Sequence, residues 1–307
     1  MVFCAQTDCY DNGAELLQQF TGTESGAAQI WRVADCYGRA LEPENTGAPT
    51  RTLTPLAKDQ MLYVQADGSM ILTRQQGWKE IKLGRIFKSS DCLHPDGKPG
   101  WVSNSQYLAH LGAHHDFAAG MEKLLHSYAQ PQSRMIFITD GATWLRDWIE
   151  QNFPAAVSIL DYYHAAEHLH QFTAIAFKGK GDKEQQWTEE QKTLLLESRL
   201  SQVLKNIEQA ALQGPPASGD AAEKLIAYYK ANRDRMDYAR YTTIGCGLIG
   251  SGAIESAHRT VIQERMKRSG QRWTIQGAQH MLNIRVVKKN KQWNKVVEIA
   301  NRVGAAA

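Results

Sequence analysis

Residues 134–149, RMIFITDGATWLRDWI, have the clearest secondary-structure pattern in the sequence. The first part of this stretch, Arg134 to Thr139, contains the apolar run Met-Ile-Phe-Ile that is typical of a buried strand. Asp140 and Gly141 follow at once, and apolar residues then recur at helical spacing, at Trp144, Leu145, Trp148 and Ile149. The stretch therefore predicts a buried strand that leads directly into an amphipathic helix.

Strand patterns also precede this stretch. Leu62–Asp67 predicts a strand, and Ser69–Leu72 predicts either its continuation or its partner. Lys79–Phe87 predicts another strand, with alternating polarity. Three antiparallel strands fit this part of the chain.

Alternating helices and strands complete the pattern. Asp116–Gln130 predicts a helix, Val157–Leu160 predicts a strand, and a further helix is expected from Tyr162 on. The resulting order, β-β-β-α-β-α-β-α, predicts an α/β fold built on a mixed sheet flanked by helices.

Two regions outside this pattern are expected to be helical. Residues 1 to about 45 have apolar side chains at near-helical spacing, so they predict either a packing pair of helices or a small DNA-binding or dimerisation module. Glu42–Thr54 is interpreted as a linker. We divide the chain into a helical segment with its linker (1–55), the first part of the core (56–177), a helical insertion (178–243) and the C-terminal part of the core (244–307).

The insertion contains its own start and stop signals. Thr188–Gln191 offers a capping box, and Leu194–Leu212 predicts a long amphipathic helix. Residues 214–216, Gly-Pro-Pro, predict a break, and Ala221–Arg233 predicts another helix. We therefore expect the whole insertion to be helical.

The composition is that of an ordinary globular protein. The 307 residues are 43% hydrophobic and 22% charged, which excludes the disordered, collagenous and coiled-coil classes. No run approaches the roughly 18 apolar residues of a membrane span, and residues 1–8 do not resemble a signal peptide. We therefore expect a soluble intracellular protein. Its five cysteines form no Cys-x-x-Cys pair, so neither a disulfide framework nor a zinc knuckle is expected.

Three carboxylates stand where an α/β fold places its ligands. Asp140 and Asp67 each follow a predicted strand, and Glu255 lies in a glycine-rich approach to a helix, residues 248–256. Each has a structural alternative. Asp140 would cap the following helix, Asp67 would belong to an Asp-Gly hairpin turn, and Glu255 would be a solvated surface residue.

The combination of the three carboxylates points to a metal site. Two Mg²⁺ or Mn²⁺ ions require shared hard oxygen ligands from converging elements. Asp67, Asp140 and Glu255 are therefore the predicted metal-binding and catalytic residues, and two-metal cleavage of phosphodiesters is the matching chemistry.

Positive charge is concentrated near the C-terminus. Residues 258–291 contain nine Lys or Arg against one acid, Glu264, although the formal charge of the whole chain is only +3. Such a segment is typical of a surface that binds phosphate backbones, and a basic solvated helix is the alternative. Trp273 would either stack on a base or anchor its helix as a buried side chain. We assign DNA binding to six residues, Arg259, Arg265, Lys267, Arg268, Arg272 and Trp273.

Two other motifs compete with this interpretation. His164–His168 matches the His-x-x-Glu-His pattern of inverted zinc peptidases, but a peptidase would leave Asp67, Asp140 and the basic segment unexplained. Gly245–Gly250 matches the dinucleotide fingerprint, but the residues after it supply neither the strand nor the acidic ribose ligand of a βαβ unit. We therefore favour neither motif.

Four blocks of sequence make the chain similar to a known family. They are QADGSM with GWKE (65–70 and 77–80), TDGA with Trp144 (139–142), LDYYHAAEHL (160–169), and IGSGAIES with RMKRSGQRW (249–256 and 265–273). On these blocks the chain resembles the catalytic region of bacterial insertion-sequence transposases of the DDE type. The resemblance lies in the Mutator-like group, is closest to the Kra type, and spans about residues 61 to 285.

The resemblance implies an RNase H-like core with an all-helical insertion before the last catalytic helix. It also implies that Asp67, Asp140 and Glu255 are the metal-binding triad. Mutator-like sequences have a Cys-x-x-His after the strand that follows the second Asp. In this chain Asp161 to His164 occupies that place, with a carboxylate where the family has a thiol. The roles of Asp161 and His164 therefore stay open. The N-terminal part is shorter than in such transposases and is interpreted as a remnant of their DNA-binding region.

The resemblance further implies strand cleavage and strand transfer at insertion-sequence ends in a bacterial, nucleoid-associated protein. One metal ion would activate water or a 3′-hydroxyl, and the other would stabilise the leaving 3′-oxygen. The expected partners are transposon-end and target DNA and a second copy of the chain in the DNA complex, with no membrane. Two alternatives stay open. One is a stand-alone RNase H-like nuclease or resolvase with the same triad, and the other is a truncated transposase that binds DNA without cutting it.

Overall fold

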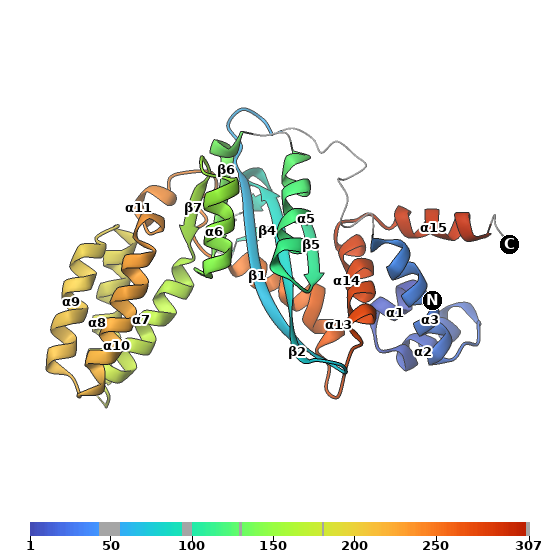
Figure 1. The fold of residues 1–307 in the computed structure, drawn as a ribbon, viewed down its shortest axis with the longest axis horizontal. Coiled ribbons are helices and arrows are strands. Elements are labelled where there is room, and N and C mark those ends of the chain that lie inside the picture. Colours follow the sequence, from blue (N-terminus) through green and yellow to red (C-terminus); the bar gives the residue numbers. More distant parts are fainter. Residues whose placement is uncertain (43–55, 94–99, 129–130, 180, 305–307) are drawn as a thin grey trace. The chain divides into compact units, whose positions relative to one another are not determined.

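A computed structural model describes residues 1–42, 56–93, 100–128, 131–179 and 181–304. The chain forms two compact units (Figure 1). The first unit consists of Met1–Ala57, Val64–Pro131 and Ala253–Ala307, and the second of Lys58–Tyr63 and Gln132–Gly252. Within the described residues, no helix combines the length and the apolar character that crossing a membrane requires.

Five strands form the main sheet in the order β5-β2-β1-β6-β7. They are β1 (Leu62–Thr73), β2 (Gly77–Lys88), β5 (Gln106–Leu111), β6 (Met135–Thr139) and β7 (Val157–Leu160). β2 and β5 are antiparallel, with Gly84 opposite Leu108, whereas β6 and β7 are parallel, with Ile138 opposite Ile159. The sheet is therefore mixed, which confirms the predicted α/β fold with a mixed sheet flanked by helices. A separate two-stranded ribbon joins β3 (Cys92–Leu93) to β4 (Trp101–Val102).

The helical elements of the first unit lie before and after its strands in the chain. They are α1 (Val2–Thr7), α2 (Tyr10–Thr21), α3 (Ala27–Ala40), η1 (Ser89–Asp91), α5 (His114–His126), α12 (Gly252–Ala257), η4 (His258–Gln263), α13 (Glu264–Met266), α14 (Ile275–Lys289) and α15 (Asn294–Gly304). The element η4 is a π-helical turn, a rare geometry that is often found at functional sites.

Strand β2 is buried on both faces from Ile81 to Phe87, because helices cover both faces there. A Cβ atom at Gly84 would overlap Met121 of α5, so this position faces α5. Ile81 and Leu83 point the other way, since side chains alternate along a strand, and they belong to the core formed with η4 and α14.

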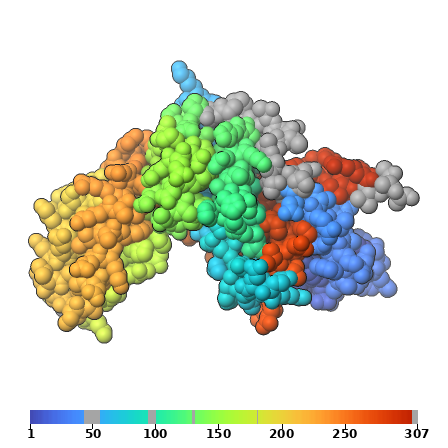
Figure 2. Space-filling view, in the orientation of Figure 1, coloured from blue at the N-terminus to red at the C-terminus, as the bar shows by residue number. Residues whose placement is uncertain are grey.

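The N-terminal helices pack against α14, whose surface lies between them and the strands of the same unit (Figure 2). Glycine is required at position 38, because a Cβ atom there would stand 2.4 Å from the backbone oxygen of His280. Asn283 adds a hydrogen bond from Nδ2 to the backbone oxygen of Gly38 at 3.0 Å. The packing of helices expected for this segment is thus confirmed. The linker predicted at Glu42–Thr54 lies outside the described residues, apart from Glu42.

The second unit combines β6 and β7 with a run of helices. These are η2 (Gln132–Arg134), α6 (Thr143–Asn152), α7 (Tyr162–Ala176), α8 (Gly181–Leu196), α9 (Leu200–Gln213), α10 (Ala217–Ala231), η3 (Arg233–Arg235) and α11 (Tyr238–Tyr241). Residues 134–149 contain the predicted buried strand, β6, and lead into the predicted helix, α6. Trp148 of α6 packs edge-on against Phe137 of β6, with ring centroids 5.8 Å apart.

Two details of the predicted insertion are wrong. The long helix expected over Leu194–Leu212 is interrupted between α8 and α9, where Ser198 adopts a left-handed φ of 58°. Thr188 does not begin a helix, because it lies inside α8 and its Oγ1 donates to the backbone oxygen of Glu184 at 2.7 Å. Neither feature has a glycine or a proline to mark it in the sequence.

The first strands also differ in detail from the prediction. Asp67 and Gly68 lie inside the twelve-residue strand β1, so the hairpin-turn alternative for Asp67 is wrong and Ser69–Leu72 continues the strand. The third strand before α5 in the sheet is β5, a run of 6 residues that was not predicted. The element order of the sheet nevertheless agrees with the expected β-β-β-α-β-α-β-α.

Helix α9 offers a test of the packing in the second unit. Ile207 is fully buried, whereas Leu212 on the same helix is 87% exposed. Ile207→Ala should lower the free energy of unfolding by about 2–5 kcal/mol, because it leaves a cavity. Leu212→Ala should change it by less than about 0.5 kcal/mol. Urea denaturation followed by circular dichroism measures both values, and equal losses would contradict the packing of α9.

Candidate functional site

Asp67 lies in the middle of β1, and its side chain is 35% exposed. The carboxylate is held on two sides. Oδ1 accepts a hydrogen bond from the backbone N–H of Gly68 at 2.6 Å, and Oδ2 lies 3.3 Å from Nε2 of His258. The side chain of Glu80 lies directly over Gly68, since a Cβ atom there would stand 2.1 Å from Oε1 of Glu80.

His258 is a buried neighbour of Asp67 that the motifs did not single out. Burial and the nearby positive charge of Lys267 lower the pKa of His258 to about 4. The imidazole is therefore neutral near pH 7, and its contact with Asp67 does not cancel the charge of the carboxylate.

Glu255 is exposed on α12, three residues before His258. Residues three apart are neighbours on a helix surface, so Glu255 lies one turn away from the side chain that contacts Asp67. Arg85 fixes the start of this helix. It is buried in β2, donates from Nε to Oγ of Ser105 at 2.9 Å, and donates from Nη1 to the backbone oxygen of Ala253.

Asp140 follows the last residue of β6 in the second unit. Its Oδ1 accepts a hydrogen bond from the backbone N–H of Ala142 at 3.0 Å, and Ala142, not Asp140, occupies the N-cap position of α6. The turn depends on Gly141, whose φ is 90° and whose Cβ would crowd Leu160. The hydroxyl of Tyr228 donates to the backbone oxygen of Asp140 at 3.1 Å. Asp140 is thus a turn residue with a half-exposed carboxylate.

Asp161, whose role the motifs left open, is buried and structural. It is the N-cap of α7, where Oδ1 accepts from the backbone N–H of Tyr163 at 2.9 Å. Its Oδ2 accepts a hydrogen bond from Oγ of Ser251. A Cβ atom at Gly250 would stand 2.4 Å from the ring of Tyr163, so the glycine-rich segment approaches the start of α7 as closely as only glycine allows.

The peptidase-like motif brings its histidines together without forming a metal cluster. The rings of His164 and His168 have centroids 4.7 Å apart, and Nδ1 of His164 lies 3.6 Å from Oε2 of Glu167. Over the described ranges, no three His, Cys, Asp or Glu side chains are grouped closely enough to hold a metal ion. Of the predicted triad, Asp67 and Glu255 belong to the first unit and Asp140 to the second.

Sequence reasoning missed the residues that hold the ends of β6 and β7. Buried Arg235 donates from Nη2 to Oγ1 of Thr139 at 2.6 Å and to the backbone oxygen of Ile159 at 3.3 Å. The hydroxyl of Tyr238 donates to the backbone oxygen of Leu160 at 3.1 Å. Burial, with the charge of Asp140, raises the pKa of Tyr228. The tyrosine-rich run over residues 228–241 is the signal that could have found this cluster.

The basic segment is divided between the surface and the core. Arg259, Lys267 and Arg272 are exposed, and Arg268 is half-buried and paired with Asp8. These four agree with a surface position, which the DNA-binding prediction requires.

Arg265 and Trp273 do not lie on that surface. The guanidinium of Arg265 is buried, stacked 4.9 Å from the ring centre of Tyr10 and 5.1 Å from that of Trp273. Its Nε donates to the backbone oxygen of Ala5 at 2.7 Å. Nε1 of Trp273 donates to the backbone oxygen of Met266 at 3.0 Å, so the buried-anchor alternative for Trp273 is confirmed. The DNA-contact role predicted for these two residues disagrees with their burial.

Comparison with known proteins gives a family. A family model described as "Uncharacterised protein family (UPF0236)" matches residues 37–303, which is most of the chain. The chain belongs to UPF0236. Asp67, Asp140 and Glu255 all lie within the matched region.

A UPF0236 relative from Streptococcus gallolyticus, named "UPF0236 protein in vanSb 3'region", is 24% identical over 275 residues. The similarity covers 84% of this chain and 54% of the relative. The chain therefore spans about half the length of that UPF0236 protein.

The burial of Arg265 in this UPF0236 protein can be tested by its stability. Arg265→Gln should lower the free energy of unfolding by about 2–4 kcal/mol, because it removes a buried charged hydrogen bond and two cation–π contacts. Arg259→Gln, at an exposed arginine of the same segment, should change it by less than about 0.5 kcal/mol. Thermal and urea denaturation of both variants decide the matter. If the Arg265→Gln variant is as stable as wild type, the buried position of Arg265 is contradicted.

Proposed function

We propose that this protein is a metal-dependent DNA phosphoryl transferase, a DDE-type transposase with an RNase H-like core that cleaves and joins strands at insertion-sequence ends. One observation carries the proposal. The helix that bears Glu255 approaches β1 so closely that His258, one turn later, contacts Asp67. Two of the three predicted acids thus come from facing elements of one unit, and the third, Asp140, ends a strand, as such a site requires.

The donor set fits the proposed cations in its chemistry. Asp67, Asp140 and Glu255 supply carboxylate oxygens, the hard ligands that Mg²⁺ and Mn²⁺ prefer. Asp67, Asp140 and Glu255 are the residues that would hold the two ions. When bound, such ions supply activation of water or a 3′-hydroxyl and stabilisation of the leaving 3′-oxygen.

Two neighbours of Asp67 have roles of their own in this proposal. His258 would position the Asp67 carboxylate without neutralising it, since a neutral imidazole brings no charge. Lys267 is exposed, and its pKa is lowered by partial burial while the charge of Asp67 opposes that shift. A lysine within electrostatic range of Asp67 would bind a phosphate of the strand that reaches the site.

The partners follow from this activity and from the exposed basic residues. Transposon-end and target DNA would be the substrates, and two copies of the chain would act together in the DNA complex. Arg259, Lys267, Arg268 and Arg272 would bind the phosphate backbone, whereas Arg265 and Trp273 would support these residues from the core. The same proposal includes a location of the protein in the bacterial nucleoid.

Substitution of Glu255 tests the chemistry. Glu255→Gln keeps the size of the side chain but removes the charge that holds a hard cation, so metal-dependent cleavage should fall by at least about 100-fold, or about 2.7 kcal/mol in the barrier. Fold and DNA affinity should survive. The matched control is Glu298→Gln, at an exposed glutamate of α15, which should cleave like wild type. The assay uses terminal-repeat DNA with Mg²⁺ or Mn²⁺ and a chelator blank.

The same assay separates the rival functions. Equal cleavage by Glu255→Gln and wild type would remove Glu255 from the mechanism. Cleavage of branched DNA without preference for the terminal repeats would favour a nuclease or resolvase. Tight binding of terminal repeats by wild type, with no cleavage, would favour a transposase derivative that only binds DNA.

A salt titration tests the DNA-binding surface. The affinity should fall steeply with salt, with a slope of log K on log salt of about −0.9 for each phosphate contact. Arg259→Gln and Lys267→Gln together should flatten that slope by up to about 2, because each removes one exposed contact. Arg39→Gln and Arg32→Gln on α3 are the matched pair for comparison. Equal slopes for both pairs would show that the C-terminal segment does not touch DNA.

A further inference from the structure

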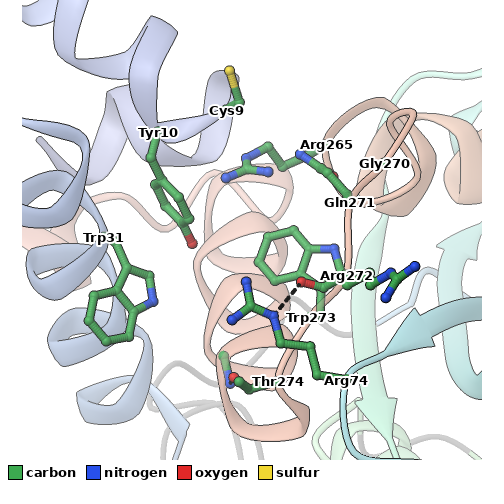
Figure 3. A pocket seen from close by; sticks show the side chains of 11 residues that line it. Cys9, Tyr10, Trp31, Arg74, Arg265, Gly270, Gln271, Arg272, Trp273 and Thr274 are labelled. Carbon is green, nitrogen blue, oxygen red and sulfur yellow. Dashed lines mark hydrogen bonds between the residues drawn. The ribbon is translucent and has the colours of Figure 1, made fainter. Parts of the chain in front are cut away.

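The first unit contains a pocket of about 470 Å³ that the proposed triad does not use (Figure 3). Its volume lies within the range of ordinary ligand sites. The pocket is formed by α2, α3, the residue after β1 and the segment that leads into α14. Six side chains give it its chemistry, namely Tyr10, Trp31, Arg74, Arg265, Arg272 and Trp273.

Aromatic rings form much of its wall. Tyr10 and Trp31 reach in from the N-terminal helices, and Trp273 faces them from the segment before α14 (Figure 3). Trp273 is buried, but Trp31 is 46% exposed, so a large flat apolar surface is open to a ligand. Flat aromatic surfaces of this kind bind planar rings, and the stacking of a nucleobase is sequence-tolerant because every base has a π-face.

Positive charge converges on the same pocket. Arg74, Arg265 and Arg272 line it, and the lining residues that the structure describes include no carboxylate. The guanidinium of Arg265 is buried behind the aromatic rings, and it adds positive charge to the wall of the pocket. Thr274, the N-cap of the fifteen-residue helix α14, also lines the pocket, and a helix N-terminus favours an anion.

The pocket has a defined position along β1. Arg74 follows the last residue of the strand, and its backbone N–H donates to the oxygen of Trp273 at 2.8 Å. Asp67 lies seven residues earlier in the same strand, which corresponds to at most about 23 Å at 3.3 Å per residue. That length equals about seven steps of a DNA strand at 3.4 Å each.

We propose that this pocket binds one unstacked nucleotide of a DNA strand, with its base on Trp31 and its phosphate on Arg74 and Arg272. The inference rests on the proposed DNA substrate and adds a second contact within about seven nucleotides of the phosphate that is cut. An unpaired nucleotide binds best, because a paired one must first leave its stack.

The experiment compares two duplexes of the same sequence, one fully paired and one with a single unpaired thymidine. Binding to the full-length protein is measured by fluorescence anisotropy in the presence of chelator, so that no cleavage occurs. Wild type should bind the bulged duplex about 5- to 150-fold more tightly, the range for stacking of one base. Trp31→Ala should abolish this preference and leave the affinity for the paired duplex unchanged. Trp101→Ala, at an exposed tryptophan of β4, should keep the preference.

The arginines and the free nucleotide form the second part of the test. Arg74→Gln should reduce the preference for the bulged duplex, whereas Arg39→Gln on α3 should not. Thymidine monophosphate should compete for the pocket only at concentrations far above those of the bulged duplex, because it lacks the flanking backbone. Equal affinity for both duplexes, or equal loss in Trp31→Ala and Trp101→Ala, would overturn the proposal. Competition by the free nucleotide at duplex concentrations would also overturn it and assign the pocket to a free nucleotide.

These outcomes are distinct from failure of the proposed function. A preference for the bulged duplex that depends on Trp31, in a protein that never cleaves DNA, would support the pocket and contradict the phosphoryl transfer. Metal-dependent cleavage by a protein without that preference would support the phosphoryl transfer and contradict the nucleotide pocket. Absence of binding to either duplex would contradict both.

Discussion

The buried guanidinium of Arg265 is the contact on which the first unit depends. It is stacked between Tyr10 and Trp273, and its Nε donates to the backbone of Ala5, so one side chain joins α1 and α2 to the segment before α14. A buried charge is costly unless it is paired, and here aromatic faces and carbonyl oxygens replace water. Trp273 in turn pairs its backbone with Leu72 at the end of β1. The end of that strand, the N-terminal helices and α14 are thus fixed around one cation.

A second buried arginine plays the same part in the second unit. Arg235 bonds to Thr139 and Ile159, which lie on the parallel strands β6 and β7. The helical region 178–243 therefore contributes to the geometry around Asp140, although it carries none of the predicted catalytic acids. In both units a charge count would place the arginine on the surface, but its side chain is buried and supports the backbone.

The sequence predicted most of the helices and strands but few of the contacts between them. Strands β6 and β7 and helices α6 and α7 follow strong apolar patterns, and the structure confirms them nearly residue by residue. Strand β5, Gln106–Leu111, was missed because it has only 6 residues and its place in the sheet is set by backbone pairing with β2. The burial of Arg265 and the contact of His258 with Asp67 depend on residues more than 190 positions apart, which no local pattern encodes. The sequence therefore proposed the three acids, but it did not indicate the residues that lie beside them.

Strand β1 connects the proposed chemistry to the proposed nucleotide pocket. A strand hydrogen-bonded inside a sheet has little freedom to stretch, so the spacing between Asp67 and Arg74 is set by the backbone. A nucleotide held at the far end of the strand would limit how far the DNA can slide past the carboxylate. Recognition of an unstacked base would then fix the position of the cut, while phosphate contacts from Lys267 and its exposed neighbours would supply affinity without sequence preference. The division of the basic segment matches this separation of roles, because buried Arg265 holds the walls of the pocket while the exposed arginines stay available to phosphates.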